Sequence, residues 1–377
     1  MLQKYFRSAF FIKLFNWEYW SFNVLYGPLY FYWIWMSIKT RTPFFINASN
    51  PLIKNGGFVL ESKKEIYDLI PTKYYPTTLL FEPGISNKAL LEDLKRSTIS
   101  FPLIAKPDIG MRGIGVEKIN TKEALLCYAE KSNVAFLIQD FVSFEQEVGI
   151  FYVRMPNELS GTITGIVGKE FMTVKGDGSS TILALLKKDS RSVLQIPYFQ
   201  KNEPTTLTQI LDNQEEKLLV PYGNHARGAK FIDISNLNSA KLTDSIDNIC
   251  KQIPHFYFGR LDIRFENWEA LTNGTCLSII ELNGAGSEPT HIYDPSHSVF
   301  FAWKEIIRHW KLLQKVSILN HQNLKIPYMD IKTGLQMLNE NRRYVKKLIN
   351  NNSQSNTEIK SKKFYIIKKR IDSFMYN

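Results

Sequence analysis

The chain has 377 residues, of which 44% are hydrophobic, and this length allows a large buried core with two or three subdomains. Its three cysteines, Cys127, Cys250 and Cys276, are isolated and odd in number, which excludes a disulfide framework and a Cys-x-x-Cys zinc site and favours a reducing cytoplasm. Of the net charge of +11, residues 1–41 carry +4 and residues 341–377 carry +8, which leaves −1 for the body.

This charge distribution argues against a nucleic-acid groove in the core and favours ends that meet an anionic surface. The segment 19–38 contains no charged residue and is rich in Trp and Tyr. Its twenty residues are just enough for a helix to span a bilayer, but a Gly-Pro pair interrupts the middle. We therefore expect residues 1–41 to form an aromatic, basic segment lying in the membrane interface, with burial in the protein or a true span as alternatives.

Residues 42–100 are expected to form a small N-terminal α/β domain. Turn-forming Asn, Pro and Gly residues are dense over 43–58. Helices are predicted over 62–70 and 87–96, with a strand between them.

A glycine-rich loop follows the strand that begins near Phe101. The strand ends at Lys106-Pro107, and Gly110, Gly113 and Gly115 come next. Glycines let backbone N–H groups surround a phosphate, and the lysine adds a positive charge. The G-x-x-G-x-G order matches neither the dinucleotide fingerprint nor the Walker motif, so a plain hairpin is the alternative.

The next apolar strand, after a predicted helix over 121–131, ends at Gln139-Asp140-Phe141-Val142. The backbone of such a strand end can hydrogen-bond an adenine edge, and Glu147 beyond it can accept hydrogen bonds from ribose hydroxyls. A plain strand connection is the alternative interpretation.

Two polar loops come later in the chain. The first, 176–179, is followed by Ser180 and Thr181, either of which can cap the next helix. The second places His225 and Arg227 between glycines. Loops of this kind can close over a reactive intermediate and exclude water. Arg227 suits an anion clamp, whereas His225 taken alone fits an exposed loop histidine better than a catalytic base.

The stretch 256–291 predicts a β-hairpin with an Asn-Gly pair in the link. Alternation places Asp262 on the same face as Arg260, and Glu281 on the same face as Asn283. Pairing of the two strands would bring the two carboxylates and the amide together. These oxygen ligands suit Mg²⁺, and a solvent-facing pair of charged strands is the alternative.

An amphipathic helix over 298–316 is expected to close the core. A polar stretch and a basic, aromatic stretch then end the chain.

Taken in order, these motifs resemble the ATP-grasp superfamily over roughly residues 60–300. They are the strand-borne Lys-Pro with its glycine loop, the strand-end linker followed by Glu, the K-G-D-G-S-S-T loop, and the D…E-x-N pattern. The similarity is greatest to D-alanine–D-alanine ligases, and the GDGSST and NHARG segments also resemble cyanophycin synthetase and other carboxylate–amine ligases.

The resemblance implies an α/β (α+β) ATP-grasp fold that holds the nucleotide between two α+β subdomains, with a small N-terminal pre-ATP-grasp domain. The expected boundaries are 1–41 for the aromatic segment, 42–100 for the N-terminal domain, 101–315 for the ATP-grasp domain, and 316–377 for the C-terminal helix and basic tail.

The resemblance also implies roles for individual residues. The residues expected to contact phosphates are Lys106, one of Lys63 or Lys64, and the loop residues Gly110, Arg112, Gly113 and Gly115. Adenine contacts fall to Gln139, Asp140, Phe141 and Val142, and the ribose contact falls to Glu147, with Glu145 as the alternative. Two Mg²⁺ ions, or Mn²⁺, would be held by Asp262, Glu281 and Asn283.

Arg260 would face the transferring phosphoryl group, with Arg227 as a second catalytic cation. The expected substrate contacts are Lys175, His225, Gly286, Ser287 and His291. The family's usual hinge Glu is Gln139 in this chain. The N-terminal aromatic region has no counterpart in the D-alanine ligase pattern, which argues against D-alanine as the substrate.

The implied function is an ATP-dependent ligase that activates a carboxylate as an acyl phosphate and joins it to an amine or amino acid. The expected location is the cytoplasm, peripheral to the inner face of the cytoplasmic membrane, with a cell-envelope or membrane-linked precursor as substrate. An ATP-grasp kinase and a non-catalytic nucleotide-binding protein at the membrane are the alternatives. No nucleic-acid partner is expected, and the oligomeric state is left open, with a dimer compatible.

Overall fold

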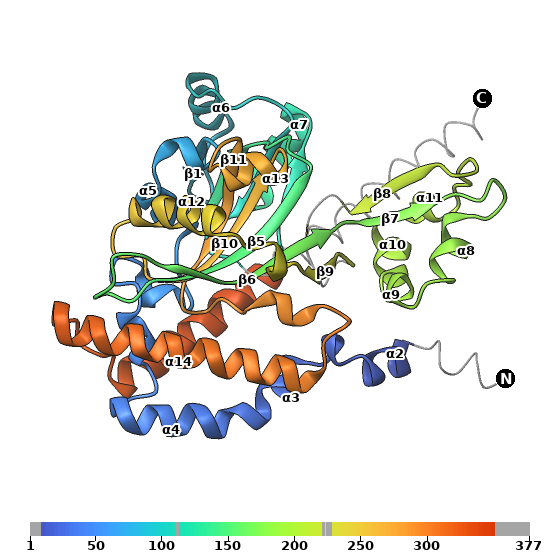
Figure 1. The fold of residues 1–377 in the computed structure, drawn as a ribbon. Helices are drawn as coiled ribbons and strands as arrows, with labels where there is room; N and C mark the ends of the chain where they lie inside the picture. The colour runs from blue at the N-terminus through green and yellow to red at the C-terminus, as the bar shows by residue number, and fades with distance from the viewer. Residues whose placement is uncertain (1–8, 111–112, 221–222, 224–227, 351–377) are drawn as a thin grey trace, which may run out of the picture. The chain divides into compact units, whose positions relative to one another are not determined.

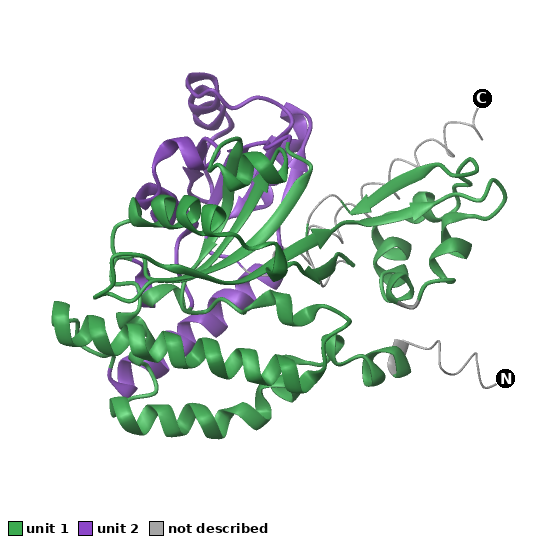
Figure 2. Cartoon of the chain, in the orientation of Figure 1, with its two compact units in different colours: residues 1–52, 56–58, 144–329 green, residues 53–55, 59–143, 330–377 purple. Residues whose placement is uncertain are grey.

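The computed structural model describes residues 9–110, 113–220, 223 and 228–350 (Figure 1). The chain divides into two compact units (Figure 2). Unit 1 comprises residues 1–52, 56–58 and 144–329, and unit 2 comprises residues 53–55, 59–143 and 330–377. The predicted mixed α/β class is confirmed, and the sheets of both units are antiparallel.

Unit 2 is built on a four-stranded sheet in the order β1-β4-β2-β3. The strands are β1 (Thr78–Phe81), β2 (Leu103–Pro107), β3 (Glu117–Ile119) and β4 (Phe136–Asp140). The helices are α5 (Lys63–Leu69), α6 (Asn87–Arg96) and α7 (Lys122–Lys131), and residues 331–350 are also helical. Leucines of α6 and α7 share one buried core with alternate residues of β2 and β4, so these two helices cover one face of the sheet.

The predicted boundary between residues 100 and 101 falls inside unit 2. Strand β1 pairs with β4 from Thr78 opposite Gln139 to Phe81 opposite Phe136, which joins the chain before Phe101 to the chain after it in one sheet. The glycine loop connects β2 and β3, which pair as an antiparallel hairpin.

Unit 1 contains a five-stranded sheet in the order β11-β10-β5-β6-β9. The strands are β5 (Gln146–Val153), β6 (Thr162–Glu170), β9 (Lys230–Asp233), β10 (Phe258–Phe265) and β11 (Leu277–Asn283). Its longer helices are α12 (Ala240–Lys251) and α14 (Val299–Leu324). A short helix, α13 (Trp268–Thr272), occupies the link of the predicted hairpin.

A smaller two-stranded sheet, β7 (Met172–Lys175) with β8 (Glu216–Val220), belongs to the same unit. It is accompanied by the short helices α8 (Ile182–Leu186), α9 (Ser190–Val193), α10 (Ile196–Asn202) and α11 (Pro204–Leu207). Thr181 caps α8 by accepting a hydrogen bond from the Ala184 amide at 3.3 Å, as one of the two predicted capping residues.

One face of the five-stranded sheet is apolar at one end of its strands and charged at the other end. Paired residues point to the same face, so Phe258 and its partner Val153 lie on the face that also carries Asp262 and its partner Gly149. At the apolar end, Phe258, Val153 and Phe151 pack in a core with residues of α14. Toward the other end the residues are charged, and the candidate site lies there.

The N-terminal segment of unit 1 consists of short helices. They are α2 (Ala9–Phe15), α3 (Phe22–Tyr26) and α4 (Tyr30–Thr40), with 3₁₀ turns at Trp17–Tyr19 and Gly27–Leu29. The Gly27-Pro28 pair therefore divides the apolar stretch, as predicted. Within the described part of the chain, no helix is both long and apolar enough to cross a membrane.

The turn-rich segment after α4 is held by Asn50, which is completely buried. Its side-chain amide donates to the carbonyls of Gly56 at 3.0 Å and Phe258 at 2.9 Å. Its oxygen accepts from the backbone amides of Tyr257 at 3.0 Å and Phe258 at 3.1 Å. One side chain thus joins this turn to the start of β10.

The same turn binds the loop that follows β11. The Ala285 amide donates to the Gly56 carbonyl at 3.0 Å, and the Gly286 amide donates to the Gly57 carbonyl at 2.7 Å. Gly57 has a φ of +77°, and a Cβ there would lie 2.6 Å from the Gly284 Cα, so both conformation and space require glycine.

Replacing Asn50 by Ala should lower the free energy of unfolding by about 3 kcal/mol, because the buried backbone groups that it pairs would lose their partners. Chemical denaturation followed by circular dichroism measures the loss. Asn248→Ala, on the exposed side of α12, is the matched control and should change stability by no more than about 0.5 kcal/mol. Equal losses in both variants would contradict the role given to Asn50.

Candidate active site

The candidate site of unit 1 begins with the pairing of β10 and β11. Asp262 stands directly opposite Glu281, and Arg260 stands opposite Asn283, with a shift in register after Asp262. The predicted strand pairing is therefore confirmed. The link between the strands contains α13 instead of a tight turn, because Asn267 caps a short helix there.

Asp262 is buried and held by two cations. Arg260 donates from Nε to Oδ1 at 2.9 Å and from a terminal nitrogen to Oδ2 at 3.1 Å. The Lys169 ammonium lies 3.4 Å from Oδ2. Gly149, opposite Asp262 on β5, leaves room for this arrangement, since a Cβ there would lie 3.1 Å from the Asp262 Oδ1.

Lys169 is the residue of this cluster that sequence reasoning missed. It lies on β6, and its ammonium donates to Glu147 at 2.7 Å in addition to its contact with Asp262. Complete burial acts to lower the pKa of Lys169, but the adjacent Asp262 and Glu147 carboxylates outweigh it and raise the pKa, so the ammonium stays charged. A lysine within the largely apolar strand sequence TITGIVGKE was the available signal.

Glu147 is bound by cations at both of its oxygens. Lys169 contacts one oxygen, and Arg264, opposite Glu147 in the strand register, lies 3.4 Å from the other. Arg264 also donates to the Phe144 carbonyl at 3.3 Å. Glu147 therefore belongs to the same charged cluster as Asp262, and the predicted ribose contact remains a proposal for it.

The donors at this end of the sheet match Mg²⁺ in chemical kind. Asp262 and Glu281 offer carboxylate oxygens, and Asn283 offers an amide oxygen. The amide nitrogen of Asn283 is buried without a hydrogen-bond partner, so the fold leaves one polar atom of this side chain unsatisfied. Across the described residues, no group of three or more His, Cys, Asp or Glu side chains is arranged for a metal ion, and the set here has only two carboxylates.

Unit 2 contains a second buried lysine, Lys106 on β2. Its ammonium donates to the Tyr67 hydroxyl at 2.9 Å and to the Gln139 side-chain oxygen at 2.8 Å. The Gln139 amide in turn donates to the Thr78 hydroxyl at 2.7 Å. Alternation places Lys106 and Gln139 on the sheet face opposite to the core that α6 and α7 cover.

Asp108 joins the start of α5 to the end of β2. Its carboxylate accepts from the Lys64 amide at 2.9 Å, and its carbonyl accepts from the Lys63 amide at 3.2 Å. The predicted second phosphate lysines are thereby fixed close in structure to the strand that carries Lys106. The Lys64 ammonium is paired with Asp68 on the surface of α5.

The predicted glycine loop begins two residues after Asp108. Gly113 and Gly115 adopt positive φ angles of 71° and 73°. A Cβ on Gly115 would lie 2.9 Å from the Pro107 side chain, so the loop also needs the small residue for close approach. Arg112 lies outside the described residues.

The predicted substrate residues are divided among different environments. Lys175 is exposed at the end of β7, and Gly286 is exposed in the loop after β11. Ser287 donates from its hydroxyl to the Gly284 carbonyl at 2.5 Å. His225 and Arg227 lie outside the described residues.

His291 is placed in the core instead of in the charged cluster. It is 3% exposed, and its Nε2 lies 3.2 Å from a Glu305 carboxylate oxygen on α14. It also packs so closely on Gly165 of β6 that a Cβ at that glycine would overlap the imidazole ring. Burial and this pairing hold His291 in the packed interior of unit 1, and its predicted substrate contact stays a prediction.

His309 belongs to the same buried group. Its Nδ1 lies 2.8 Å from the Glu305 carbonyl, and its Nε2 lies 3.0 Å from the Thr164 hydroxyl. Burial and the nearby Arg308 cation lower the pKa of His309 from 6.5 to about 3.

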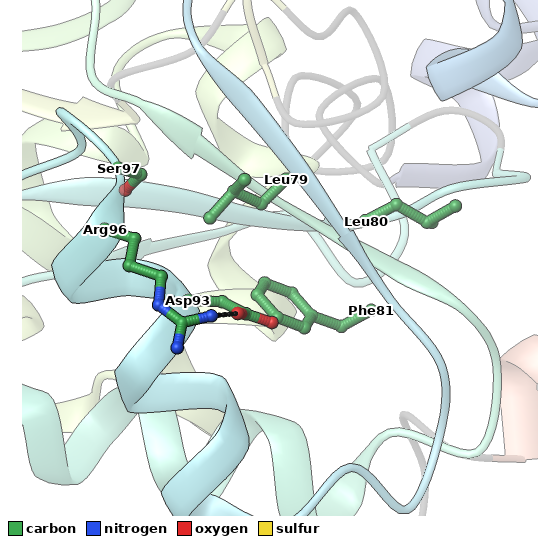
Figure 3. A pocket seen from close by; sticks show the side chains of 6 residues that line it. All are labelled: Leu79, Leu80, Phe81, Asp93, Arg96 and Ser97. Atoms are coloured by element: carbon green, nitrogen blue, oxygen red, sulfur yellow. Dashed lines mark ion pairs between the residues drawn. The ribbon is translucent and has the colours of Figure 1, made fainter.

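A pocket of unit 2 is lined by none of the predicted site residues (Figure 3). It is lined by Leu79, Leu80, Phe81, Asp93, Arg96 and Ser97. Its charged residues, Asp93 and Arg96, form an exposed ion pair at 3.8 Å on one turn of α6. The pocket therefore offers no buried charge or convergent polar group for chemistry.

No family model matches the chain, and no curated protein matches it. Among solved structures it is similar to a bifunctional glutathione synthetase from Pasteurella multocida (14% identity, TM-score 0.37). It is also similar to VanG D-Ala:D-Ser ligase from Enterococcus faecalis (13%, 0.39) and to D-alanine–D-alanine ligase from Bacillus anthracis (12%, 0.37). The three matches cover 67%, 69% and 70% of this chain.

The chain spans 35% of the length of the glutathione synthetase, 61% of the D-Ala:D-Ser ligase and 68% of the D-alanine–D-alanine ligase. At TM-scores below 0.5, these likenesses assign neither a family nor an activity. The site is therefore interpreted from its own residues.

Replacing Lys169 by Met should lower the free energy of unfolding by about 3–5 kcal/mol, because Glu147 and Asp262 would lose the cation between them. Adding Glu147→Gln should recover part of the loss, since one buried charge is removed. Urea denaturation measures both effects. Lys230→Met, which removes an exposed partner of Glu170 on the neighbouring strand, is the control and should cost less than about 1 kcal/mol. Similar losses for the two lysines would contradict the buried cluster.

Stability should fall by about 2 kcal/mol between pH 7 and pH 5 through His309 alone. The folded-state pKa of His309 lies below its unfolded value of 6.5, so the unfolded chain binds the proton first and acid favours unfolding. His309→Gln should remove this part of the pH dependence, measured as the difference between the two proteins in urea denaturation at each pH. Parallel pH profiles would contradict the buried neutral imidazole.

Proposed function

We propose that the chain is an ATP-dependent ligase that activates a carboxylate as an acyl phosphate and joins it to an amine. The observation that carries this proposal is the buried charged cluster at one end of the five-stranded sheet. Burying charged side chains costs free energy, and a cluster of them with shifted pKa values is characteristic of a functional site. The cluster consists of Glu147, Lys169, Arg260, Asp262 and Arg264.

The proposed nucleotide contacts of unit 2 rest on Lys106 and the glycine loop. The Lys106 ammonium donates hydrogen bonds to Tyr67 and Gln139, which hold it in one position and so suit a residue that must meet a phosphate. Gly110, Gly113 and Gly115 offer backbone amides for the phosphates. The strand end from Gln139 to Val142 is proposed for adenine, and Lys63 or Lys64 for a second phosphate contact.

Asp262, Glu281 and Asn283 are proposed to hold Mg²⁺. When bound, the metal ion supplies positive charge to the phosphate oxygens of ATP, which is the usual requirement of phosphoryl transfer. The chain's own contribution is the pair of cations beside Asp262. Arg260 and Lys169 are charged and held by their ion pairs with Asp262, so they need little reorganisation when negative charge develops.

The proposed reaction has two steps. A substrate carboxylate oxygen attacks the γ-phosphorus of ATP and ADP leaves, which brings two anions together. Arg260 reduces this repulsion as the residue that faces the transferring phosphoryl group. The amine nitrogen then attacks the acyl carbon and gives up a proton, the bond from that carbon to the phosphate oxygen breaks, and inorganic phosphate leaves, so no covalent protein nucleophile is required.

The substrate carboxylate is proposed to bind at the loop containing Gly286 and Ser287. Arg260 donates to the Glu288 carbonyl in this loop at 3.2 Å, which links the loop to the charged cluster. The Glu288 carboxylate accepts from the Tyr26 hydroxyl at 2.6 Å. Because Tyr26 belongs to the aromatic N-terminal segment, this contact favours a membrane-linked or cell-envelope precursor as the substrate. Arg227 stays a proposal as a second catalytic cation, and Lys175, His225 and His291 stay proposals for substrate contacts.

The test is ADP formation from ATP and Mg²⁺ in the presence of pooled amino acids and cell-envelope precursors. A ligase should form ADP over many turnovers only when a carboxylate and an amine are both present. ADP formation that needs a hydroxyl compound and no amine would identify a kinase instead, and no turnover with any pool would overturn the proposal.

Asp262→Ala and Glu281→Ala should each lower turnover at least 100-fold, since each removes a carboxylate proposed to hold the metal ion that offsets the negative charge of the phosphates. Glu266→Ala, at an exposed residue directly after β10, is the matched control and should leave turnover unchanged. Wild-type turnover in either site variant would show that the site is wrongly assigned.

A further inference from the structure

Helix α4 carries apolar side chains on two opposite sides. One side packs on α14, where Met36 is completely buried and its carbonyl accepts from the Gln314 side chain at 2.8 Å. Trp33 adds an edge-on ring contact with Trp310 at 4.9 Å on the same side. The two helices run beside each other in unit 1 (Figure 1).

The other side of α4 is exposed. Phe31, Ile34, Trp35 and Ile38 recur at helical spacing and are 80%, 58%, 46% and 71% exposed. A single exposed apolar residue is ordinary, but four large ones on one face of an 11-residue helix form an unpartnered stripe. This stripe, here called the α4 face, requires an apolar partner.

Lysines lie beside two aromatic rings of α4 and in a row along α14. The Lys39 ammonium lies 4.0 Å from the centre of the Trp35 ring, and Trp35 lies 5.3 Å from the Tyr32 ring. The Lys311 ammonium of α14 lies 5.8 Å from Tyr32. Lys304 and Lys315, also exposed, extend the positive charge along α14.

Negative charge does not offset this row. The only acidic residue of segment 9–41 is Glu18, and the only one of segment 298–324 is Glu305. Both are largely buried and paired with arginines, Glu18 with Arg191 and Glu305 with Arg308. The exposed charge of these two segments is therefore positive.

We propose that the α4 face docks in the interface of an anionic phospholipid bilayer, with Lys39 and Lys311 among the headgroups. Aromatic and aliphatic side chains on one face, bordered by lysines, are the pattern of a helix that lies in the interface plane. With 11 residues, α4 is about 16 Å long, half the thickness of the hydrocarbon core, so it lies along the surface.

Charge favours a lipid partner over a second copy of the chain. In a symmetric dimer the same patch faces itself, so the lysines that border one α4 face would meet those of the other. Anionic headgroups instead offer the complementary charge. The proposal does not depend on ligase activity, and its test needs no ATP.

The experiment is sedimentation of the full-length protein with vesicles, either pure phosphatidylcholine or containing 30% phosphatidylserine. Phe31→Glu/Ile38→Glu should weaken binding to the anionic vesicles at least tenfold. Leu159→Glu/Ile210→Glu is the matched control, because it adds the same charge at side chains that are 91% and 57% exposed elsewhere, and it should bind like the wild type.

Lys39→Ala and Lys311→Ala should each weaken binding to anionic vesicles by about fivefold and leave binding to neutral vesicles unchanged. Blue-shifted emission from a fluorophore on Ile34→Cys, in a chain with Cys127→Ser and Cys276→Ser, should accompany vesicle binding and report insertion of the α4 face itself. Circular dichroism of each variant checks its fold.

Three results would overturn the proposal. Wild-type protein could stay in the supernatant with both vesicle types. Phe31→Glu/Ile38→Glu could bind as tightly as the wild type, which would assign binding to the basic ends. The wild type could be a dimer that this variant dissociates, without lipid binding, which would make the α4 face a contact between copies of the chain.

Discussion

The ion pairs of Lys169 are the interaction on which the charged end of the five-stranded sheet depends. The ammonium lies between Glu147 on β5 and Asp262 on β10, two carboxylates that are adjacent because their strands pair. Without that cation, Glu147 and Asp262 would each keep an arginine partner, but the two buried negative charges would have no cation between them. The cluster forms because the sheet places β5, β6 and β10 side by side. Its carboxylates can be buried there because each of them contacts cations.

Antiparallel pairing explains how one sheet serves as both core and site. Residues opposite each other share a face, so a single face runs from Phe258 and Val153, packed near α14, to Asp262 and Glu281. Packing at the apolar end holds the strands in place. The charged side chains lie on the same strands, so their positions are also held. The Asn50 turn reinforces the arrangement, since it hydrogen-bonds the start of β10 and leads into the glycines that bind the loop after β11.

The N-terminal segment connects the proposed membrane surface with the proposed substrate loop. Its α4 helix packs on α14 with one side and exposes aromatic and aliphatic residues on the other. Tyr26, four residues before α4, donates to Glu288 in the loop after β11. A ligase whose substrate loop contacts the proposed membrane-facing segment is suited to a substrate presented at a lipid surface. The proposed ligase activity and the proposed membrane binding are therefore compatible, and neither depends on the other.

The sequence by itself determined what depends on neighbours along the chain. Strand alternation placed Asp262 and Glu281 on facing positions of a hairpin, glycine spacing located the β2–β3 loop, and helical periodicity located α14. Only the tertiary structure decided what depends on distant segments: that Lys169 completes the charged cluster, that Asn50 joins β10, and that His291 is packed against Glu305. These contacts depend on which strands and turns become neighbours in the fold. The partners lie many residues apart in the sequence, so local residue spacing does not indicate which of them will meet.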